Sequence, residues 1–438
     1  MPNPIKALFR TARSFFLATP AQKITHGPLI GFVDEIGLRH VHGWVTDADN
    51  PVARLPVEAF LPDTGECLGN GLADQFHHGI AGVGDNSRTY GFWFRLKRDI
   101  TQDERGRLHL RVAQTGAEIG FSPALTAWEP LLHVAMDIVN NCNLRCPFCL
   151  YDYKDVRKTN VMTRETLEAA LRFMPYTRNG EFWFSCLHEP TLHPDFMAFL
   201  DAVPPEMRRK VFFTSNLARR MPETYFQALA LSGIKHINIS LESLDSAVYE
   251  RMRKGARFPI FMENWDQLLA AFNAAQSPVA LHYIIMAYRS NLSELPDLAR
   301  YLVEHRRADR VEIRYTFDVP FIDAEFREHE FLAETDWNWL EAQLSAVGSD
   351  KIILLRPPVS SEASDAVETD RQDVPDAGVL PGRYLARLSW DGTFELRGLS
   401  KASRGDSMIE IPILTANVRD IADPQTFLND LAKSHVNA

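Results

Sequence analysis

The sequence predicts an α/β protein whose core has six βα units, fewer than the eight of a full barrel, with an antiparallel β-sandwich before it and a short α+β extension after it. Three observations lead to this prediction. Short alternating strands and turn signals fill residues 27–125. Apolar strands and helical segments then alternate over residues 131–346, as in repeated βα units. From 350 to 438 the pattern weakens to one hairpin and a helical tail.

Length, net charge and cysteine content argue against several classes of protein. A chain of 438 residues is too long for one ordinary domain. Its formal net charge of −10 argues against a nucleic-acid partner. The 5 cysteines are few and odd in number, which argues against a secreted disulfide framework. No run approaches the ~18 apolar residues of a membrane span. We therefore expect a cytoplasmic protein.

The first segment, residues 1–26, is basic and has apolar residues at helical spacing, among them Ile5, Leu8, Phe9 and Phe15. It lacks the small-residue cleavage site of a signal peptide. Such a helix either docks on its own protein or lies weakly on a membrane surface. We expect docking and keep the membrane surface as the alternative.

The β-sandwich prediction rests on four short strands and the turns between them. These strands are VHGWVTD (41–47), VEAFLP (57–62), YGFWFRLK (90–97) and LHLRVAQ (108–114). Turn signals stand at 49–51 and 63–65, and Cys67 is expected in a turn, without a chemical role. The pattern resembles a β-sandwich module that accompanies enzymes of bacterial surface polysaccharides.

The core prediction rests on the change of period at about Leu131. The expected strands are HVAMDIV (133–139), EFWFSCL (181–187), KVFFTS (210–215), HINISL (236–241), VALHYIIM (279–286) and RVEIRYTF (310–317). The expected helices are 164–174, 195–203, 222–232, 245–254, 261–275, 293–306 and 334–346. In the extension, Asp391-Gly392 marks a hairpin within 384–398, and 424–433 reads as a closing helix.

Polar and cysteine side chains follow four successive core strands. They are Cys142, then His188 and Glu189, then Ser215 and Asn216, then Ser240 and Glu242. Parallel strands bring their carboxyl ends to the same side of the sheet, where such folds place their active sites. The sequence therefore predicts one site built from these strand ends.

The stretch 140-NNCNLRCPFCLYDY-153 contains Cys142, Cys146 and Cys149. Thiolates bind zinc, copper(I) or iron–sulfur clusters. A structural zinc site requires four ligands, and no second cysteine pair occurs elsewhere in the chain. Three thiolates on a four-iron cluster would leave one iron open for another ligand. The spacing therefore favours a catalytic cluster.

The run CNLRCPFC after a strand closely resembles the cluster loop of radical S-adenosylmethionine (SAM) enzymes. The resemblance implies a partial TIM-like barrel, a [4Fe–4S] cluster on Cys142, Cys146 and Cys149, and SAM bound to the open iron. It also implies reductive cleavage of SAM to a 5′-deoxyadenosyl radical that takes hydrogen from a substrate. An electron donor such as a flavodoxin or ferredoxin is expected with it.

The same resemblance implies the SAM contacts. Phe148 occupies the aromatic position that often meets the adenine, and Glu189 matches a Gly-Gly-Glu-Pro type motif for the amino group. Leu187 and His188 stand where the family has glycines, so His188 would meet SAM or substrate, or serve only the structure. Cys186 is expected to be a buried strand cysteine.

On the third and fourth strands, Asn216, Ser240 and Glu242 are the expected SAM contacts by the same resemblance. Asn216 would equally suit a strand-to-helix cap. Arg251 or Arg253 would suit the SAM carboxylate, although a solvated helix face is the more ordinary role for each.

The substrate is less constrained. Candidate pocket residues on strands five and six are His282, Tyr283, Met286, Arg314, Tyr315 and Asp318, and alternation turns half of them outward. The 388-LSWDGTFEL-396 hairpin resembles the start of a SPASM or twitch extension, but no cysteine follows Cys186. We therefore expect a single-cluster enzyme.

The β-sandwich suggests polysaccharide or glycoconjugate metabolism, so the substrate is expected to be a small molecule or glycan. A peptide-modifying maturase is the alternative enzyme. Two other classes remain. One is a degenerate radical SAM fold that acts as a scaffold or carbohydrate-binding subunit. The other is a zinc-stabilised binding protein, which would need His133 or His188 as its fourth ligand.

Overall fold

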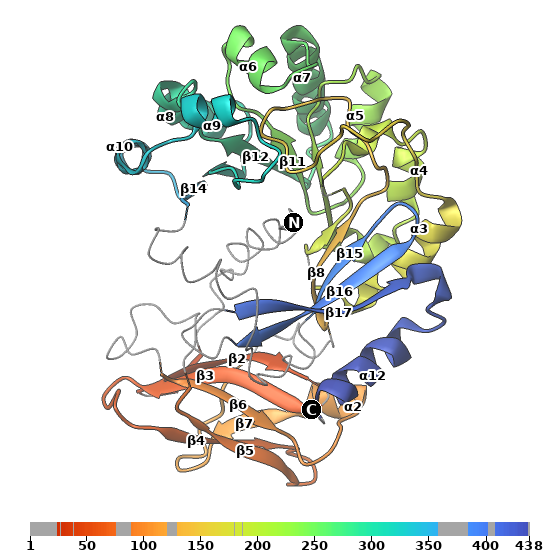
Figure 1. The fold of residues 1–438 in the computed structure, drawn as a ribbon. Helices are drawn as coiled ribbons and strands as arrows, with labels where there is room; N and C mark the ends of the chain where they lie inside the picture. Colours follow the sequence, from red (N-terminus) through yellow and green to blue (C-terminus); the bar gives the residue numbers. More distant parts are fainter. Residues whose placement is uncertain are drawn as a thin grey trace.

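The computed structural model describes residues 24–26, 28–37, 39–75, 89–120, 129–178, 180–185, 187–357, 384–401 and 408–436. The expectations on residues 1–23 and on Cys186 lie outside this description. Two small antiparallel sheets lie at one end of the molecule, and one large sheet with its helices forms the rest (Figure 1). None of the described helices has the length and apolar character needed to cross a bilayer.

The N-terminal part contains two antiparallel sheets. One has the order β1 (Ile24–His26), β2 (Leu29–Ile36), β3 (His40–Asp47) and β6 (Gly91–Arg95). The other has the order β5 (Cys67–Ala73), β4 (Leu55–Phe60) and β7 (His109–Val112). The short helix α2 (Gln102–Arg107) begins at a capping box formed by Thr101 and Glu104. Cys67 begins β5 opposite Phe60, so the expectation that it lies in a turn was wrong.

One apolar core joins these two sheets. It includes Val33 and Phe92 from the first sheet and Val57 and Leu110 from the second. Strict alternation on β4, with the apolar side chains buried, directs them to this core.

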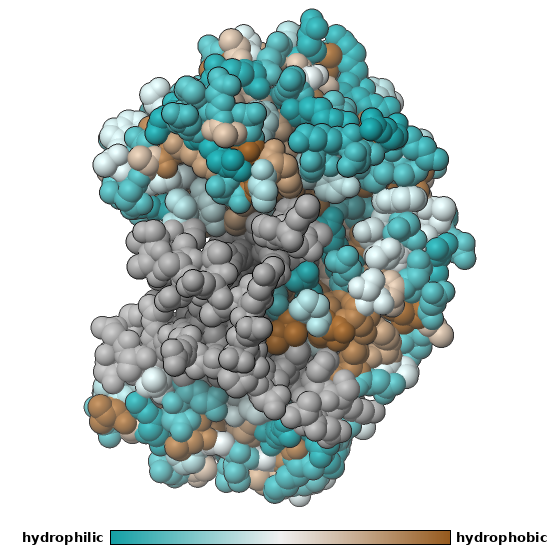
Figure 2. Space-filling model, viewed as in Figure 1, coloured by the Kyte–Doolittle hydropathy of each residue, from teal (hydrophilic) through white to brown (hydrophobic). Residues whose placement is uncertain are grey.

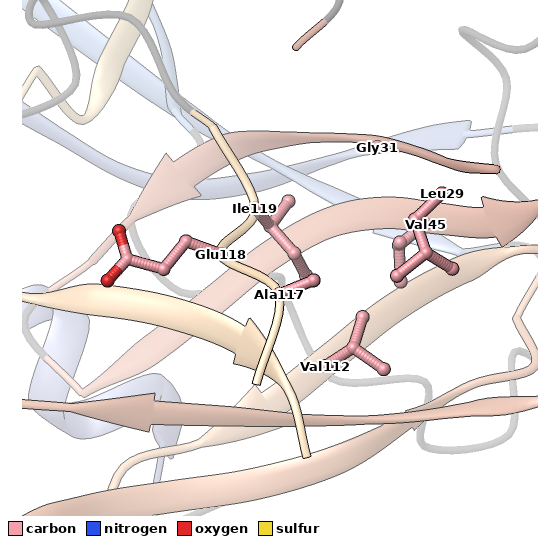
Figure 3. Close-up of a pocket in the computed structure, with 7 residues that line it drawn as sticks. All are labelled: Leu29, Gly31, Val45, Val112, Ala117, Glu118 and Ile119. Carbon is pink, nitrogen blue, oxygen red and sulfur yellow. The ribbon is translucent and has the colours of Figure 1, made fainter. Parts of the chain in front are cut away.

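A small pocket lies within this core, lined by Leu29, Gly31, Val45, Val112, Ala117, Glu118 and Ile119 (Figure 3). The carboxylate of Glu118 points away from the other lining side chains and lies 3.0 Å from Nδ1 of His109. The lining is therefore apolar, and the pocket offers packing space rather than groups that orient a ligand.

The large sheet has the order β14-β13-β12-β11-β10-β9-β8-β15-β16-β17. Neighbours from β8 to β14 are parallel, and β15 is parallel to β8. Strand β16 is antiparallel to both of its neighbours, β15 and β17. The strands are β8 (Leu131–Met136), β9 (Phe182–Trp183), β10 (Val211–Ser215), β11 (His236–Ser240), β12 (Ala280–Met286), β13 (Arg310–Arg314), β14 (Ile352–Leu355), β15 (Tyr384–Leu388), β16 (Thr393–Lys401) and β17 (Met408–Asn417).

Helices follow the parallel strands and cover the outer side of the sheet (Figure 1). They are α3 (Arg164–Leu171), α4 (Phe196–Asp201), α5 (Glu223–Ala230), α6 (Ser246–Met252), α7 (Phe258–Ala274), α8 (Leu295–His305), α9 (Ala324–Glu330) and α10 (Glu334–Val347), with α12 (Pro424–Val436) near the end of the chain. Short 3₁₀ turns lie at Met174–Tyr176, Pro190–Leu192, Pro205–Lys210, Leu292–Glu294 and Val418–Asp420. The fold is therefore α/β, as the alternation of strands and helices predicts.

The sheet differs from the expectation at both edges. The short run β14 adds a further parallel strand beside β13, although we expected the core to stop at 346. The hairpin at Gly392 forms as predicted, but it joins the same sheet through β15, which pairs with β8. Strand β9 is also shorter than the expected 181–187, because the Ser185 hydroxyl bonds back to the carbonyl of His188 and turns the chain.

Candidate active site

The three clustered cysteines lie in the loop that follows β8 and carry no disulfide. Burial raises the pKa of each thiol, to about 12 for Cys142, and for Cys142 and Cys146 the charge of neighbouring cysteines adds to the effect. The three sulfur atoms are therefore close enough to act on one another electrostatically. A cationic metal group would reverse this effect and favour the thiolates.

Arg145 fixes the shape of the cysteine loop. Its guanidinium donates to the carbonyls of Cys142 at 2.6 Å and Leu144 at 2.7 Å and to Oδ1 of Asn141 at 3.1 Å. It also lies 4.6 Å from the ring centre of Tyr153. One side chain thus holds both the backbone and the aromatic wall of the loop.

The loop rests on the segment after α6. The backbone N–H of Arg145 donates to the carbonyl of Lys254 at 2.8 Å. The next residue, Gly255, has a φ of +100°, and a Cβ there would lie 3.4 Å from the carbonyl oxygen of Asn143. Only glycine adopts such a backbone without strain.

Asn216, at the end of β10, contacts the first cysteine. Its side-chain amide donates to Oδ1 of Asn143 at 2.9 Å and to Sγ of Cys142 at 3.5 Å. The backbone N–H of Leu144 also donates to this sulfur at 3.5 Å. Two donors thus point at the Cys142 sulfur, as in sites that stabilise a thiolate ligand.

Glu189 is 3 % exposed, and both of its oxygen atoms accept hydrogen bonds from the protein. Oε1 accepts from the hydroxyls of Thr191 at 2.8 Å and Ser215 at 3.0 Å and from the N–H of Thr191 at 3.3 Å. Oε2 accepts the N–H of Asn216 at 2.8 Å. Three donors bind Oε1 and one binds Oε2, so the carboxylate of Glu189 connects the turn after β9 to the end of β10.

His188 is buried next to the cysteine loop. Its Nδ1 lies 2.9 Å from the hydroxyl of Tyr153, and its ring contacts Tyr151 edge-on at 4.7 Å. The Tyr153 hydroxyl also lies 3.2 Å from the carbonyl of Leu187, so this tyrosine holds both the His188 ring and the backbone beside it. Burial lowers the pKa of His188, which keeps the ring neutral.

Leu187, directly before His188, contacts Asp137, the residue after β8. The N–H of Leu187 donates to Asp137 at 2.9 Å, and Asp137 lies 3.4 Å from Arg387 of β15. This buried contact joins the strand-two turn to the C-terminal hairpin, whose docking the sequence did not predict.

Glu242 and Arg253 form a buried, two-point ion pair. Glu242 is fully buried, and its two oxygens accept from Nε and, at 2.6 Å, from Nη2 of Arg253. The guanidinium lies 5.6 Å from the ring centre of Phe148. Arg251 is instead exposed and lies 3.5 Å from Glu330. Ser240 is the last residue of β11, two residues before Glu242, and is 9 % exposed.

Phe148 is the buried centre of an aromatic group beside the loop. Its ring lies 5.2 Å from Tyr288 and 6.3 Å from Phe326. Met252 and the partly buried Cys146 belong to the same apolar cluster. The aromatic wall thus borders the cysteine loop directly.

The ligating side chains near the loop are not arranged to hold a single metal ion. In the described ranges, no three His, Cys, Asp or Glu side chains converge on a point where one metal ion would sit. The two histidines considered as zinc ligands have other partners, because His133 lies 3.0 Å from Glu181 and His188 bonds Tyr153. In a four-iron cluster each thiolate binds a different iron, so the sulfurs need not converge on one atom. The residues therefore fit a cluster better than a single ion.

Several residues of this site were not predicted from sequence. Tyr151 and Tyr153 follow the last cysteine at alternate positions, a signal that could have placed both beside the loop. Gly255 had a signal too, since an isolated glycine after a helix often marks a positive φ. No signal in the sequence predicts the pairing of Glu242 with Arg253, because each residue by itself is equally typical of a surface position or a ligand contact.

Comparison with known proteins agrees with this geometry. Residues 136–302 match the family model described as the radical SAM superfamily. These residues form a radical SAM superfamily domain. Members of this superfamily are enzymes that use a [4Fe–4S] cluster and SAM. The match therefore confirms the two predicted cofactors and the prediction of an enzyme at the level of the superfamily. The reaction on substrate is left open.

Curated relatives include the GTP 3′,8-cyclases of Microcystis aeruginosa and Marinobacter nauticus. The first is 24 % identical over 180 residues, covering 40 % of this chain and 53 % of the relative. The second is 23 % identical over 199 residues, covering 45 % of this chain and 56 % of the relative. The chain thus spans about half the length of the curated relatives it matches.

Among solved structures, SuiB of Streptococcus suis bound to SAM matches with a TM-score of 0.47 and 14 % identity. The match covers 70 % of this chain and 68 % of SuiB.

Proposed function

We propose that this radical SAM protein is a single-cluster enzyme that generates a 5′-deoxyadenosyl radical and uses it to take hydrogen from a substrate. The observation that carries the proposal is the partly buried loop of Cys142, Cys146 and Cys149 at the carboxyl ends of the parallel strands, within the matched domain. The bound cluster and SAM supply one-electron cleavage of SAM, yielding methionine and the radical.

The chain's own residues then have separate roles. Cys142, Cys146 and Cys149 are the proposed cluster ligands, and the donors of Leu144 and Asn216 orient the Cys142 sulfur. Arg145 keeps the loop in shape.

The remaining contacts concern SAM. Phe148 and the rings beside it form the apolar wall proposed for the adenine, and Ser240 is proposed as a polar contact at the end of β11. His188 stands at a glycine position of the family motif, and its Nε2 is proposed to hydrogen-bond SAM or substrate while Nδ1 meets Tyr153. Glu189, Asn216 and Glu242 are proposed to act through the positions of their neighbours, because their polar groups already bond the protein.

We also propose that β8 to β14 form the family's partial barrel, which extends the core from 131 to about 355. The two N-terminal sheets, 27–125, are proposed as a β-sandwich accessory domain. Its resemblance to modules of polysaccharide enzymes supports a substrate from polysaccharide or glycoconjugate metabolism. The relatives that act on GTP support a second candidate, a nucleotide. A flavodoxin or ferredoxin is the proposed electron donor.

The test is anaerobic. The full chain is reconstituted with iron and sulfide, reduced with dithionite and mixed with SAM, and 5′-deoxyadenosine is measured by mass spectrometry. We expect 5′-deoxyadenosine from the wild type and none from Cys146→Ala, with Cys67→Ala as the matched control that retains activity. A bound cluster without cleavage would support the degenerate scaffold. Zinc in place of iron and sulfide would overturn the proposal.

A further inference from the structure

A second group of polar side chains lies on the face of the large sheet turned away from its helices. On β11 to β13 the residues Ile237, Ile239, Leu281, Tyr283, Ile285, Val311 and Ile313 belong to the helix-covered core. Side chains alternate along a strand, so their neighbours point to the opposite face. These neighbours are His236, Asn238, Ser240, His282, Arg310, Glu312 and Arg314.

Strand register brings these residues into rows. Asn238 pairs with His282, and His282 pairs with Arg310, so the three stand side by side across β11, β12 and β13. One row further toward the cysteine loop, Ser240 pairs with Ile284 and Ile284 with Glu312. Successive residues on one face are about 7 Å apart along a strand. The polar group therefore begins one such step from Ser240, at the strand end where the site lies.

A series of stacked rings packs against the row that contains Asn238 and His282. Trp183 stacks on Phe212 at 5.4 Å, Phe212 on His236 at 4.5 Å, and His236 on His282 at 4.0 Å. The hydroxyl of Thr214 accepts from Trp183 at 3.1 Å and from the amide of Asn238 at 3.2 Å. The imidazoles and the amide are thus held in fixed orientations by packing.

Several buried atoms in this group lack a hydrogen-bond partner among the described residues. They are both ring nitrogens of His236, Oδ1 of Asn238, Nδ1 of His282 and Nε of Arg314. His236 is 5 % exposed and Asn238 is 3 % exposed. Leaving such a group unpaired costs about 1–3 kcal/mol, and folded proteins seldom tolerate several together.

The charges differ between the two ends of the group. Burial and the nearby charges of Lys235 and Arg310 lower the pKa of both histidines, to about 3 for His282, so the rings are neutral. At the other end, Glu312 lies 3.0 Å from Arg310 and 3.2 Å from Arg314. Two guanidinium groups thus meet at one carboxylate, and the buried Nε of Arg314 is a donor still without an acceptor.

We infer that this group is the substrate site, and that its ligand is a small molecule with hydroxyl groups at one end and an acidic group at the other. This inference rests on the proposed function and names the substrate class for it. A hydroxyl both donates and accepts, which suits neutral imidazoles and the Asn238 oxygen. A carboxylate or phosphate suits the arginine end, where a guanidinium binds it through two hydrogen bonds. A sugar acid, a sugar phosphate and a nucleotide share this chemistry.

The test measures binding to the full chain by calorimetry, with glucuronate, glucose 1-phosphate and GTP as separate probes. The reconstituted protein is kept unreduced, so binding does not depend on cleavage of SAM. We expect at least one probe to bind, which also identifies the source of the acidic group. His282→Phe and Arg314→Gln should each weaken that binding about tenfold or more. The matched control is Arg300→Gln, at an exposed ion pair on α8.

A stability measurement separates lost binding from lost folding. His282→Phe keeps the ring stack on His236 but removes the unpaired nitrogen, so its melting temperature without probe should equal or exceed that of the wild type. Failure of every probe to bind the wild type, or equal binding by the wild type and both variants, would overturn the inference. Neither result would affect 5′-deoxyadenosine formation, which tests the proposed function separately.

Discussion

Oε2 of Glu189 accepts the backbone N–H of Asn216 at 2.8 Å, which ties the turn after β9 to the end of β10. The side chain of Asn216 then reaches Asn143 and the sulfur of Cys142. Glu189 was expected to contact SAM. It instead begins a series of contacts that ends on Cys142, a proposed cluster ligand. The loss of the family's glycines at Leu187 and His188 accompanies this arrangement.

Glu189→Gln tests that arrangement. The new amide would place a donor against the donors of Thr191, Ser215 or Asn216, so we expect a loss of about 1–3 kcal/mol in the free energy of unfolding. Urea unfolding measures it, and reconstitution should show less iron bound per chain. Glu168→Gln, on the exposed face of α3, is the matched control. A variant with unchanged stability and weakened SAM binding would instead make Glu189 a direct SAM contact.

Gly255→Ala should disturb the cysteine loop through the backbone. The φ of +100° is unfavourable for any residue with a Cβ, and the new atom would lie 3.4 Å from the carbonyl of Asn143. We expect about 1–2 kcal/mol of lost stability and reduced cluster content by iron analysis. Gly106→Ala is the control, because a Cβ there meets no neighbouring atom. Equal effects of the two changes would contradict the role given to Gly255.

Glu242→Gln should destabilise the protein strongly, because it leaves the Arg253 guanidinium buried without its counter-charge. Breaking a buried pair in this way costs about 3–5 kcal/mol. The double change Glu242→Leu with Arg253→Met should cost less than the sum of the single changes, as urea unfolding would show. The control is Arg251→Gln, because the exposed side chain of Arg251 can be hydrated when its contact with Glu330 is lost, and we expect a change of about 0–1 kcal/mol. Additive single effects would show that the pair is not coupled.

The sequence predicted the parts of the molecule that depend on local pattern. The cysteine spacing, the alternation on β10 to β13 and the turn at Gly392 are each contained within a few residues, and the structure has the strands and the hairpin there. The four strand ends also meet, since parallel pairing fixes which ends lie together.

The parts that could not be predicted depend on partners far apart in the sequence. The four-residue run of β14 is too short for its period to separate it from a loop. The docking of β15 on β8 joins residues about 250 apart, as the contact of Asp137 with Arg387 does. Glu189 was expected to face SAM because its motif is local, whereas the donors that occupy it come from Ser215 and Asn216 on another strand.

Stability should fall as the pH is lowered, in part through the stacked pair His236 and His282. Both rings are neutral in the folded protein because burial lowers their pKa, to about 3 for His282, with Lys235 and Arg310 adding to the effect. The unfolded chain takes up protons below a pH of about 6.5. Above that pH the two rings leave the free energy of unfolding unchanged. Below it, each ring lowers the free energy of unfolding by about 1.4 kcal/mol per pH unit, until the pKa of the folded protein is reached.

His282→Phe removes one of these two contributions. Between pH 7 and pH 5 the wild type should therefore lose about 2 kcal/mol more than the variant in the free energy of unfolding by urea. The other titrating groups are common to both proteins and cancel in the difference. His305→Phe, on the exposed surface of α8, should show no such difference. If His282→Phe loses as much stability as the wild type over this range, the ring at 282 is charged in the folded protein, and the ligand that suits it would be an anion rather than a hydroxyl.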